Sequence, residues 1–456
     1  MSAKCKVQSA KFLKSIFYLC LSVFICGQIS LFAQNGGTQQ NLIGRAGTFA
    51  ITGARIVTVS GAVIEGGTVV IQNGKIVAVG VNAAVPADAE SINGNGLTVF
   101  PGMIDAGTNM GLSEIGQGVP GSVDIAETGN MNANAKASKG INPHSSHINV
   151  TRVNGITSVL SMPIGGVISG QAAVINLNGS TEAEMAIIPE FGLVINFPRV
   201  STFGGFTPGA GRQTIDFNEA VKRRDKSLED LKKMFKDAES YARVQEAYAK
   251  DKTLPYSPKD IKTEAMIPYM RGEKPIIFTA EREADIRSVV KFVEEMKVKG
   301  IVMGGGDAWK VADGLKKNNI PVIFTNIYNL PAQDDDAYDY FYEGPSKLQK
   351  AGVKFAVSTG NDGSEVRDLP YHAGIAGAFG LGHDDALKAV TLYPAQILGI
   401  ADKYGSVEVG KMANIIVADG DILDPRTNIK YIFINGRLIP LTSRHTELFD
   451  AFKDRK

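Results

Sequence analysis

The chain has 456 residues, a length that fits one large α/β domain with a satellite or two to three ordinary domains. Hydrophobic residues make up 44% and charged residues 21%, which argues against long disorder, a coiled coil or a multi-span membrane protein. The 48 basic and 47 acidic residues give a formal net charge of +1, so no net field favours nucleic acid or an anionic membrane.

Residues 1–34 have the pattern of a secretory signal peptide. Four lysines between Lys4 and Lys14 precede an apolar run from Ile16 to Phe32, and we expect cleavage near Ala33 or Gln34. An uncleaved anchor helix is the alternative, although the run is marginal for the roughly 20 residues that a span needs. The pattern predicts a protein of the bacterial periplasm or of the cell exterior, with no transmembrane domain after cleavage.

All three cysteines lie in this segment: Cys5, Cys20 and Cys26. The mature chain would therefore have no disulfide, no thiolate metal ligand and no cysteine nucleophile. Export without disulfides suits a domain large enough to be stabilised by its core.

Residues 35–47 form a polar linker, and two β-rich segments then occupy the ends of the mature chain. Residues 48–98 contain short apolar runs with a hairpin signal at Asn73-Gly74. Residues 404–440 show the same pattern of short apolar runs around a second hairpin signal, Asn435-Gly436. We predict one small β-sandwich built from both ends, the alternative being two unrelated hairpins. Residues 441–456 are expected to form a C-terminal tail.

Residues 99–403 alternate short apolar runs with helical stretches such as Arg282–Met296 and Asp307–Lys317. Eight runs read as strands, most of them apolar throughout, as parallel strands buried on both faces require. This alternation predicts a (β/α)8 TIM barrel rather than an open sheet. The expected strands are Val99–Asp105, Thr157–Met162, Ala172–Leu177, Gly192–Phe197, Ile276–Ala280, Gly300–Met303, Val322–Thr325 and Lys354–Thr359.

Residues 216–251 interrupt the alternation as a charged helical insertion. Apolar residues recur along it at spacings of three, four or seven, as on one face of a helix. This face is expected to pack over the barrel or against a second subunit. Its members are Leu228, Leu231, Phe235, Ala238, Tyr241 and Tyr248.

Three pairs of segments together resemble the amidohydrolase superfamily, in its imidazolonepropionase-like secreted branch. The resemblance implies a metal-dependent hydrolase fold acting on non-peptide C–N bonds, with one or two divalent metals at the carboxyl ends of the barrel strands. The segments are Lys75–Gly80 with Val99–Asp105, Gly155–Leu160 with Gly170–Ile175, and Pro394–Gly399 with Gly405–Asn414.

The metal ligands that the resemblance implies are missing from their positions. The family uses His-x-His after the first strand, where this chain has Gly107 and Asn109. A single histidine is expected after strand five and another after strand six, where Thr279 and Gly304 stand. The aspartate after strand eight falls on Gly360 or, with a shift, on Asn361 or Asp362, which makes Asp362 the one remaining catalytic candidate. Without imidazoles the Lewis acid itself is lost, so we predict no metal ligands and no cofactor.

The chain's histidines do not replace these ligands by sequence, because no two of them have zinc-ligand spacing. Only His372 could approach the barrel mouth. The five histidines are His144, His147, His372, His383 and His445.

Carboxylates offer a second way to hold a metal, since oxygen ligands suit calcium or magnesium. Six could converge on the carboxyl face: Asp105, Glu114, Glu281, Asp307, Asp362 and Glu365. Arg282 and Arg367 could instead pair with these acids or bind an anionic ligand. Our candidate ligand-binding residues are Asn109, Thr279, Glu281, Arg282, Asp307 and Arg367.

Two functions remain open at this point. The favoured one is an exported, non-catalytic relative that binds a small molecule or supports a partner, either a second copy of itself or an intact amidohydrolase. The alternative is an active hydrolase with a divergent, carboxylate-based site for a zinc-like divalent metal.

Overall fold

The structure, a computed structural model, describes residues 41–114, 121–207, 211–325, 327–331, 334–360 and 363–455. The expected signal peptide and most of the expected linker lie outside the described residues. From Asn41 onward the described residues belong to one unit. No helix within these ranges is long and apolar enough to cross a membrane.

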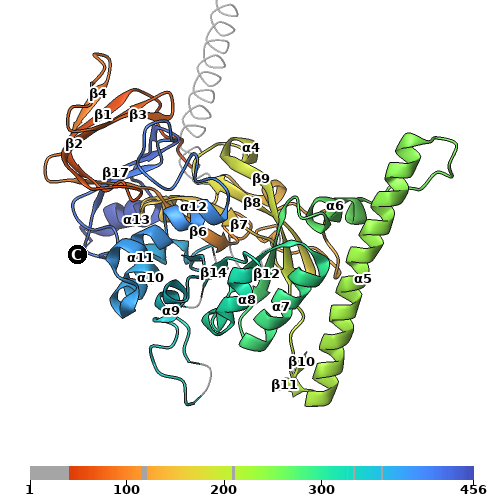
Figure 1. The fold of residues 1–456 in the computed structure, drawn as a ribbon. Helices are drawn as coiled ribbons and strands as arrows, with labels where there is room; N and C mark the ends of the chain where they lie inside the picture. Colours follow the sequence, from red (N-terminus) through yellow and green to blue (C-terminus); the bar gives the residue numbers. More distant parts are fainter. Residues whose placement is uncertain are drawn as a thin grey trace, which may run out of the picture. The chain divides into compact units, whose positions relative to one another are not determined.

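Strands from both ends of the chain form one eight-stranded sheet (Figure 1). Its order is β18-β17-β16-β5-β1-β2-β3, with β4 also paired to β1. Hairpin turns at Asn73 and Asn435, both with positive φ, connect neighbouring strands as the Asn-Gly signals predict. The N-terminal strands are β1 (Phe49–Ile56), β2 (Ile64–Gln72), β3 (Lys75–Gly80), β4 (Glu90–Asn93) and β5 (Thr98–Pro101); the C-terminal ones are β16 (Ile415–Ala418), β17 (Ile429–Ile434) and β18 (Arg437–Leu438).

One buried core lies against this terminal sheet. Phe49 of β1 and Phe433 of β17 meet edge to face at 5.1 Å between ring centroids, so residues nearly 400 positions apart share one core. Strands from the two chain ends therefore share one sheet and one core, as expected, although they form a single sheet and not two facing sheets.

The eight barrel strands follow one another around a second sheet, in the order β6-β7-β8-β9-β12-β13-β14-β15. The prediction of a barrel is confirmed. The strands are β6 (Met103–Thr108), β7 (Ile156–Ser161), β8 (Ile168–Asn176), β9 (Ala186–Asn196), β12 (Pro275–Ala280), β13 (Lys299–Gly304), β14 (Val322–Phe324) and β15 (Phe355–Val357).

Two details differ from the expected parallel barrel. Strand β8 is antiparallel to both β7 and β9. Only six residues separate Ser161 from Ile168, whereas a parallel neighbour needs a crossover of about a dozen residues. The expected strand Val99–Asp105 is also divided: it leaves the terminal sheet at Pro101 and enters the barrel at Met103.

Helices cover the barrel after most strands of its second half. Helix α7 (Glu283–Met296) connects β12 to β13, and the pair η2 (Ala308–Val311) and α8 (Ala312–Lys317) connects β13 to β14. The remaining helices are α2 (Ala137–Gly140), α3 (Ser146–Arg152), α4 (Glu182–Met185), α9 (Gly344–Lys350), η3 (Val366–Asp368), α10 (Leu369–Ala376), η4 (Gly377–Leu381), α11 (His383–Ala389), α12 (Leu392–Ile397) and α13 (Arg444–Phe452).

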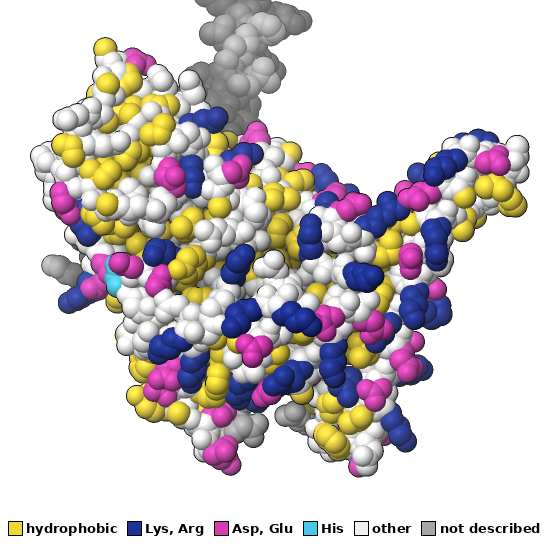
Figure 2. Space-filling model, in the orientation of Figure 1, with side chains coloured by type: hydrophobic (Ala, Val, Ile, Leu, Met, Phe, Trp, Pro, Cys, Tyr) yellow, Lys and Arg dark blue, Asp and Glu magenta, His cyan; other side chains and the backbone are white. Residues whose placement is uncertain are grey.

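The charged insertion is a single long helix, α5 (Phe217–Lys250), followed by α6 (Ile261–Met270). Asp216 caps its first turn by accepting from the backbone amides of Asn218 and Glu219. Figure 2 shows basic and acidic side chains interspersed along α5, in keeping with its i,i+4 ion pairs such as Lys233–Asp237.

The apolar face of α5 packs on the barrel's outer helices. Phe235 is 1% exposed and meets Phe292 of α7 edge to face at 5.3 Å, while Phe292 in turn contacts Phe278 of β12. Leu231 and Ala238 are fully buried in the same core. The insertion therefore extends the barrel core outward. A small hairpin, β10 (Phe203–Thr207) with β11 (Gly211–Thr214), precedes it.

Candidate functional site at the carboxyl ends of the strands

Asp105 closes the barrel instead of facing a ligand. The sheet begins at β6 and ends at β15, with no ladder between these two strands. Asp105 of β6 is fully buried and accepts hydrogen bonds from the side chains of Ser358 and Thr359, directly after β15. The backbone amides of Thr359 (3.2 Å) and Gly107 (3.1 Å) complete its shell. Burial raises the pKa of Asp105 to about 6, although these hydrogen bonds lower it. The geometry supports a structural role for Asp105, and not the metal-binding role considered from the sequence.

Gly107, the first histidine position of the family, faces a filled barrel interior. A Cβ at Gly107 would lie 2.7 Å from Met303 Cε and 3.1 Å from its sulfur. Met303 belongs to β13, is 4% exposed and packs in the apolar cluster inside the barrel with Ile104 and Ile301. A thioether and aliphatic side chains therefore fill the space beside Gly107.

Gly304, where the resemblance places the histidine after strand six, also has little free space beside it. Its φ is +103°, a conformation suited to glycine, and a Cβ there would lie 2.3 Å from Glu281 Oε1. Glu281 follows β12, and its other carboxylate oxygen accepts from the Gly306 amide at 3.3 Å. The Glu281 carboxylate, and the Ala280 backbone carbonyl at 3.0 Å, lie where a side chain at position 304 would begin.

Asn109 and Thr279, the two other positions, have partners within the protein. Asn109 Oδ1 accepts from the Gly363 amide at 2.7 Å, which ties the end of β6 to the segment after β15. Thr279 Oγ1 lies 3.2 Å from Asn196 Oδ1 at the end of β9. Each side chain holds neighbouring strand ends together.

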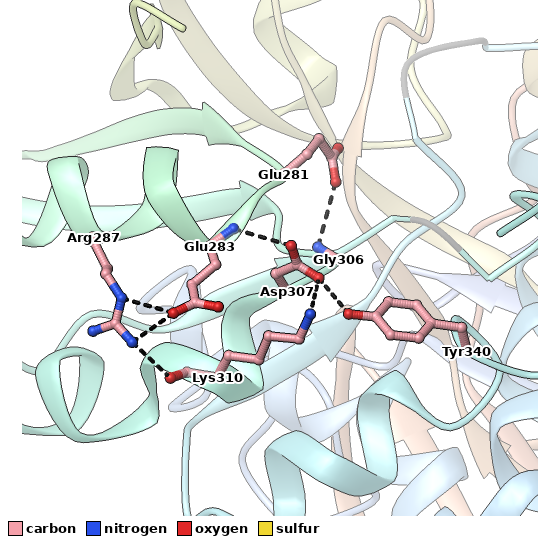
Figure 3. A network of polar contacts seen from close by, with 7 residues as sticks. All are labelled: Glu281, Glu283, Arg287, Gly306, Asp307, Lys310 and Tyr340. Atoms are coloured by element: carbon pink, nitrogen blue, oxygen red, sulfur yellow. Dashed lines mark hydrogen bonds and ion pairs between the residues drawn. The ribbon is translucent and has the colours of Figure 1, made fainter. Parts of the chain in front are cut away.

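Asp307, after β13, is the centre of a polar network with Glu281 beside it (Figure 3). Its carboxylate accepts from the Tyr340 hydroxyl, from Lys310 Nζ at 3.1 Å and from the Glu283 amide at 3.1 Å. Burial opposes ionisation of Asp307, but these bonds outweigh it and lower its pKa. Asp307 is therefore an ionised, fully engaged acid.

A cavity of about 480 Å³ opens at the ends of β9, β12, β13 and β14. Three of the expected residues, Glu281, Arg282 and Asp307, line it. Ligand sites of TIM barrels lie at this face, because the loops after the strands converge there. The other lining residues are Arg199, Val200, Ser201, Asp285, Gly306, Asn329, Leu330 and Phe341.

The remaining candidates lie elsewhere or cannot be placed. Arg367 pairs with its neighbour Asp368 at 3.8 Å and is not among the residues lining this cavity. Glu114 accepts from the Ser146 amide at 3.3 Å, at the start of α3. Glu365 precedes η3, and Asn361 and Asp362 lie outside the described residues. The structure thus brings three of the predicted residues, Glu281, Arg282 and Asp307, to one cavity.

No histidine is among the described residues that line this cavity. His372 of α10 is buried against Tyr328, with ring centroids 4.1 Å apart, and burial lowers its pKa to about 4. His383 pairs with Asp421 at 2.7 Å, while His147 contacts the Glu114 carbonyl. Within the described ranges, no three His, Cys, Asp or Glu side chains form a group suited to a metal ion.

The sequence interpretation missed Met303, Arg199 and Asp285. Arg199 comes three residues after β9, and Asp285 lies in the first turn of α7, so a rule that follows every strand end would have found both. Met303 gave no such signal, because one apolar residue in an apolar strand does not reveal which glycine it faces.

A larger cavity of about 960 Å³ lies at the opposite, amino-terminal ends of β12 to β15. Its walls include Phe191, Phe355, Tyr393 and Leu398. In TIM barrels this face serves stability, so we place the candidate site at the carboxyl ends.

Comparisons with known proteins agree with this architecture. The sequence model of the amidohydrolase family matches residues 329–439. A crystal structure of an amidohydrolase from Thermotoga maritima is similar with a TM-score of 0.75 and 25% identity, covering 86% of this chain and 99% of that one. The chain has the amidohydrolase fold. No curated protein sequence matches it significantly.

More distant amidohydrolase-fold structures show the fold alone. A molinate hydrolase is 15% identical with a TM-score of 0.53, covering 88% of this chain and 96% of that one. An adenosine deaminase from Xanthomonas campestris with bound zinc is 15% identical with a TM-score of 0.50, covering 90% and 98%.

The residues present do not fit the metal that this fold often holds. Met303 and Glu281 fill the space beside Gly107 and Gly304, and Asn109 and Thr279 are engaged with protein atoms. A catalytic zinc site normally has three protein ligands, and these four positions offer no imidazole.

Proposed function

We propose that this protein is an exported member of the amidohydrolase superfamily that binds a small molecule and does not perform metal-dependent hydrolysis. One observation carries the proposal: the Met303 and Glu281 side chains occupy the space where metal-binding histidines would project from positions 107 and 304. Without a Lewis acid, no metal-bound water can be ionised near neutral pH.

The cavity supports the binding part of the proposal. It lies at the barrel's carboxyl face and combines an apolar wall, with Leu330 and Phe341, and charged groups such as Arg282. Ligand pockets typically have such a mixed lining.

An active, carboxylate-based metal site is the alternative, and the proximity of Glu281 to Asp307 favours it (Figure 3). Asp362 would be its third ligand. Against it, Asp307 is already bound to Lys310 and Tyr340, so a metal would have to displace an ammonium group from the carboxylate.

Elemental analysis of the mature protein after dialysis, paired with an amide and lactam hydrolysis screen, tests the proposal. We expect no stoichiometric transition metal, no turnover, and a melting temperature that chelator leaves unchanged. About one zinc or manganese per chain with chelator-sensitive turnover would overturn it. In that case Glu281→Gln and Asp307→Asn should abolish both metal and turnover.

Export is tested separately by N-terminal sequencing of the protein produced with its full leader. We expect the mature chain to begin near Gln34 or Asn35, as the lysine-rich start and the apolar run predict. A mature chain that begins at Met1 or Ser2 contradicts this part of the proposal.

A further inference from the structure

We propose that the cavity at the carboxyl ends of β9, β12, β13 and β14 binds a small organic anion, whose carboxylate or phosphate group is held by Arg199 and Arg282. This inference rests on the proposed function, and it specifies the class of ligand.

The two arginines are placed on the cavity by well-packed segments. Arg199 follows Phe197, which is 4% exposed and packs edge to face on Phe278 and Phe292. Arg282 is the N-cap residue of α7, two residues after the end of β12. Both backbones are therefore anchored in the barrel core while both guanidinium groups are exposed at the cavity.

Among the described residues neither guanidinium forms a direct hydrogen bond or salt bridge, although both act electrostatically on Asp285. Neighbouring cations do have partners: Arg287 binds Glu283 at 2.6 Å, and Lys310 binds Asp307 at 3.1 Å. A guanidinium offers paired N–H donors that match a carboxylate or phosphate bidentately. Two unpaired arginines on one concave surface therefore favour an anionic group.

Three acidic residues also line the cavity. The Asp307 carboxylate is paired with the Lys310 ammonium and accepts from the Tyr340 hydroxyl, which offsets its charge. Glu281, which accepts from the neutral Gly306 amide, and Asp285 remain as opposing charges; burial raises the pKa of Asp285, whereas Arg199, Arg224 and Arg282 lower it. The amino terminus of the 14-residue helix α7 lies at the same place, but its dipole is already matched by Asp307, which accepts from the Glu283 amide, and by the acids of its first turn, so the two guanidinium groups are the donors left for a ligand.

Isothermal titration of the mature protein with inorganic phosphate and with succinate, at constant ionic strength, tests the inference. Wild type should bind at least one probe saturably. Arg199→Gln and Arg282→Gln should each weaken binding about tenfold or more, as expected for a charge-assisted bond. Asp285→Asn should strengthen it severalfold, because a negative charge beside the anion is removed.

Matched controls separate binding from folding. Arg271→Gln removes an arginine that pairs with Glu246 on α5, away from the cavity, and should bind both probes as wild type does. Arg282→Lys keeps the charge and should retain part of the affinity. Circular dichroism and the melting temperature of each variant verify that the fold is intact.

Several outcomes overturn the inference: no saturable binding of either probe, wild-type affinity in Arg199→Gln and Arg282→Gln, or weaker binding by Asp285→Asn. The preference for succinate over phosphate, or the reverse, distinguishes a carboxylate from a phosphate ligand. A metal-free, inactive protein that binds neither probe contradicts only this inference, whereas chelator-sensitive turnover contradicts the proposed function.

Discussion

Asp105 and Thr359 are joined by two hydrogen bonds to one carboxylate oxygen, from the Thr359 amide at 3.2 Å and from its hydroxyl. They bridge the first and last strands of the barrel sheet, which have no ladder of their own. A buried carboxylate thus joins the two strands in place of backbone hydrogen bonds. Because its burial shifts its pKa, the stability of this junction depends on pH.

We predict that Asp105 makes the protein's stability depend on pH between about 4 and 7. The folded pKa of about 6 exceeds the ordinary value of 3.8, so the folded state binds the proton more tightly than the unfolded state does. Stability from this group is fully present below pH 3.8 and is lost as the pH rises through 6.

The Asp105→Asn variant isolates this effect. As the pH falls from 7 to 4, wild type should gain on the order of 2 kcal/mol of unfolding free energy relative to the variant. Urea unfolding of both proteins across this pH range is the measurement. If the difference in unfolding free energy between them does not change with pH, Asp105 does not have a raised pKa in the folded protein.

Gly107 and Met303 should be energetically coupled. Gly107→Ala places a Cβ 2.7 Å from Met303 Cε and should destabilise the fold by about 1–3 kcal/mol. Met303→Ala should cost about 2–5 kcal/mol through the cavity it leaves. In the double variant the added Cβ meets no sulfur, so the coupling energy in a double-mutant cycle should be about 1 kcal/mol or more. Additive costs would show that Met303 does not fill the space beside Gly107.

His372 should work against stability in acid. Its folded pKa of about 4 lies below the ordinary 6.5, so stability from the neutral ring is present above pH 6.5 and is lost as the pH falls through 4. Because Nδ1 is buried without a partner among the described residues, His372→Phe should be nearly neutral at pH 7.5.

The measurement is the difference in unfolding free energy between wild type and His372→Phe. As the pH falls from 6.5 to 4, the unfolding free energy of the variant should rise by up to about 3 kcal/mol relative to that of wild type. This change is opposite in sign to the one expected for Asp105. Equal acid sensitivity of the two proteins would rule out His372 as a buried neutral group.

Phe235 should be the residue that holds α5 on the barrel. Phe235→Ala removes a ring that is 1% exposed and packed on Phe292, and should cost about 3–5 kcal/mol. Val244→Ala, on the same helix but 48% exposed, should change stability by no more than about 0.5 kcal/mol. Thermal and urea unfolding check both, and equal small effects would mean that α5 packs independently of α7.

By itself, the sequence determined the architecture. Buried strands and amphipathic helices are recognisable from apolar periodicity, and Asn-Gly turns mark hairpins, because these patterns follow from local backbone geometry. The apolar spacing within residues 216–251 therefore predicted the helix α5, and the eight apolar runs predicted the barrel. That Gly107, Asn109, Thr279 and Gly304 stand where the resemblance places metal ligands was also a prediction from the sequence.

Only the tertiary structure decided which side chains lie beside these four positions and which charged groups line one cavity. Strand β8 runs antiparallel because its connections are short, a property of the chain path and not of the strand's own composition. Met303 faces Gly107 from a strand almost 200 residues away, and Arg199 and Arg282 reach one cavity from different strands. Such pairings depend on register and on the direction of side chains around a closed sheet, which a linear pattern of residues does not contain.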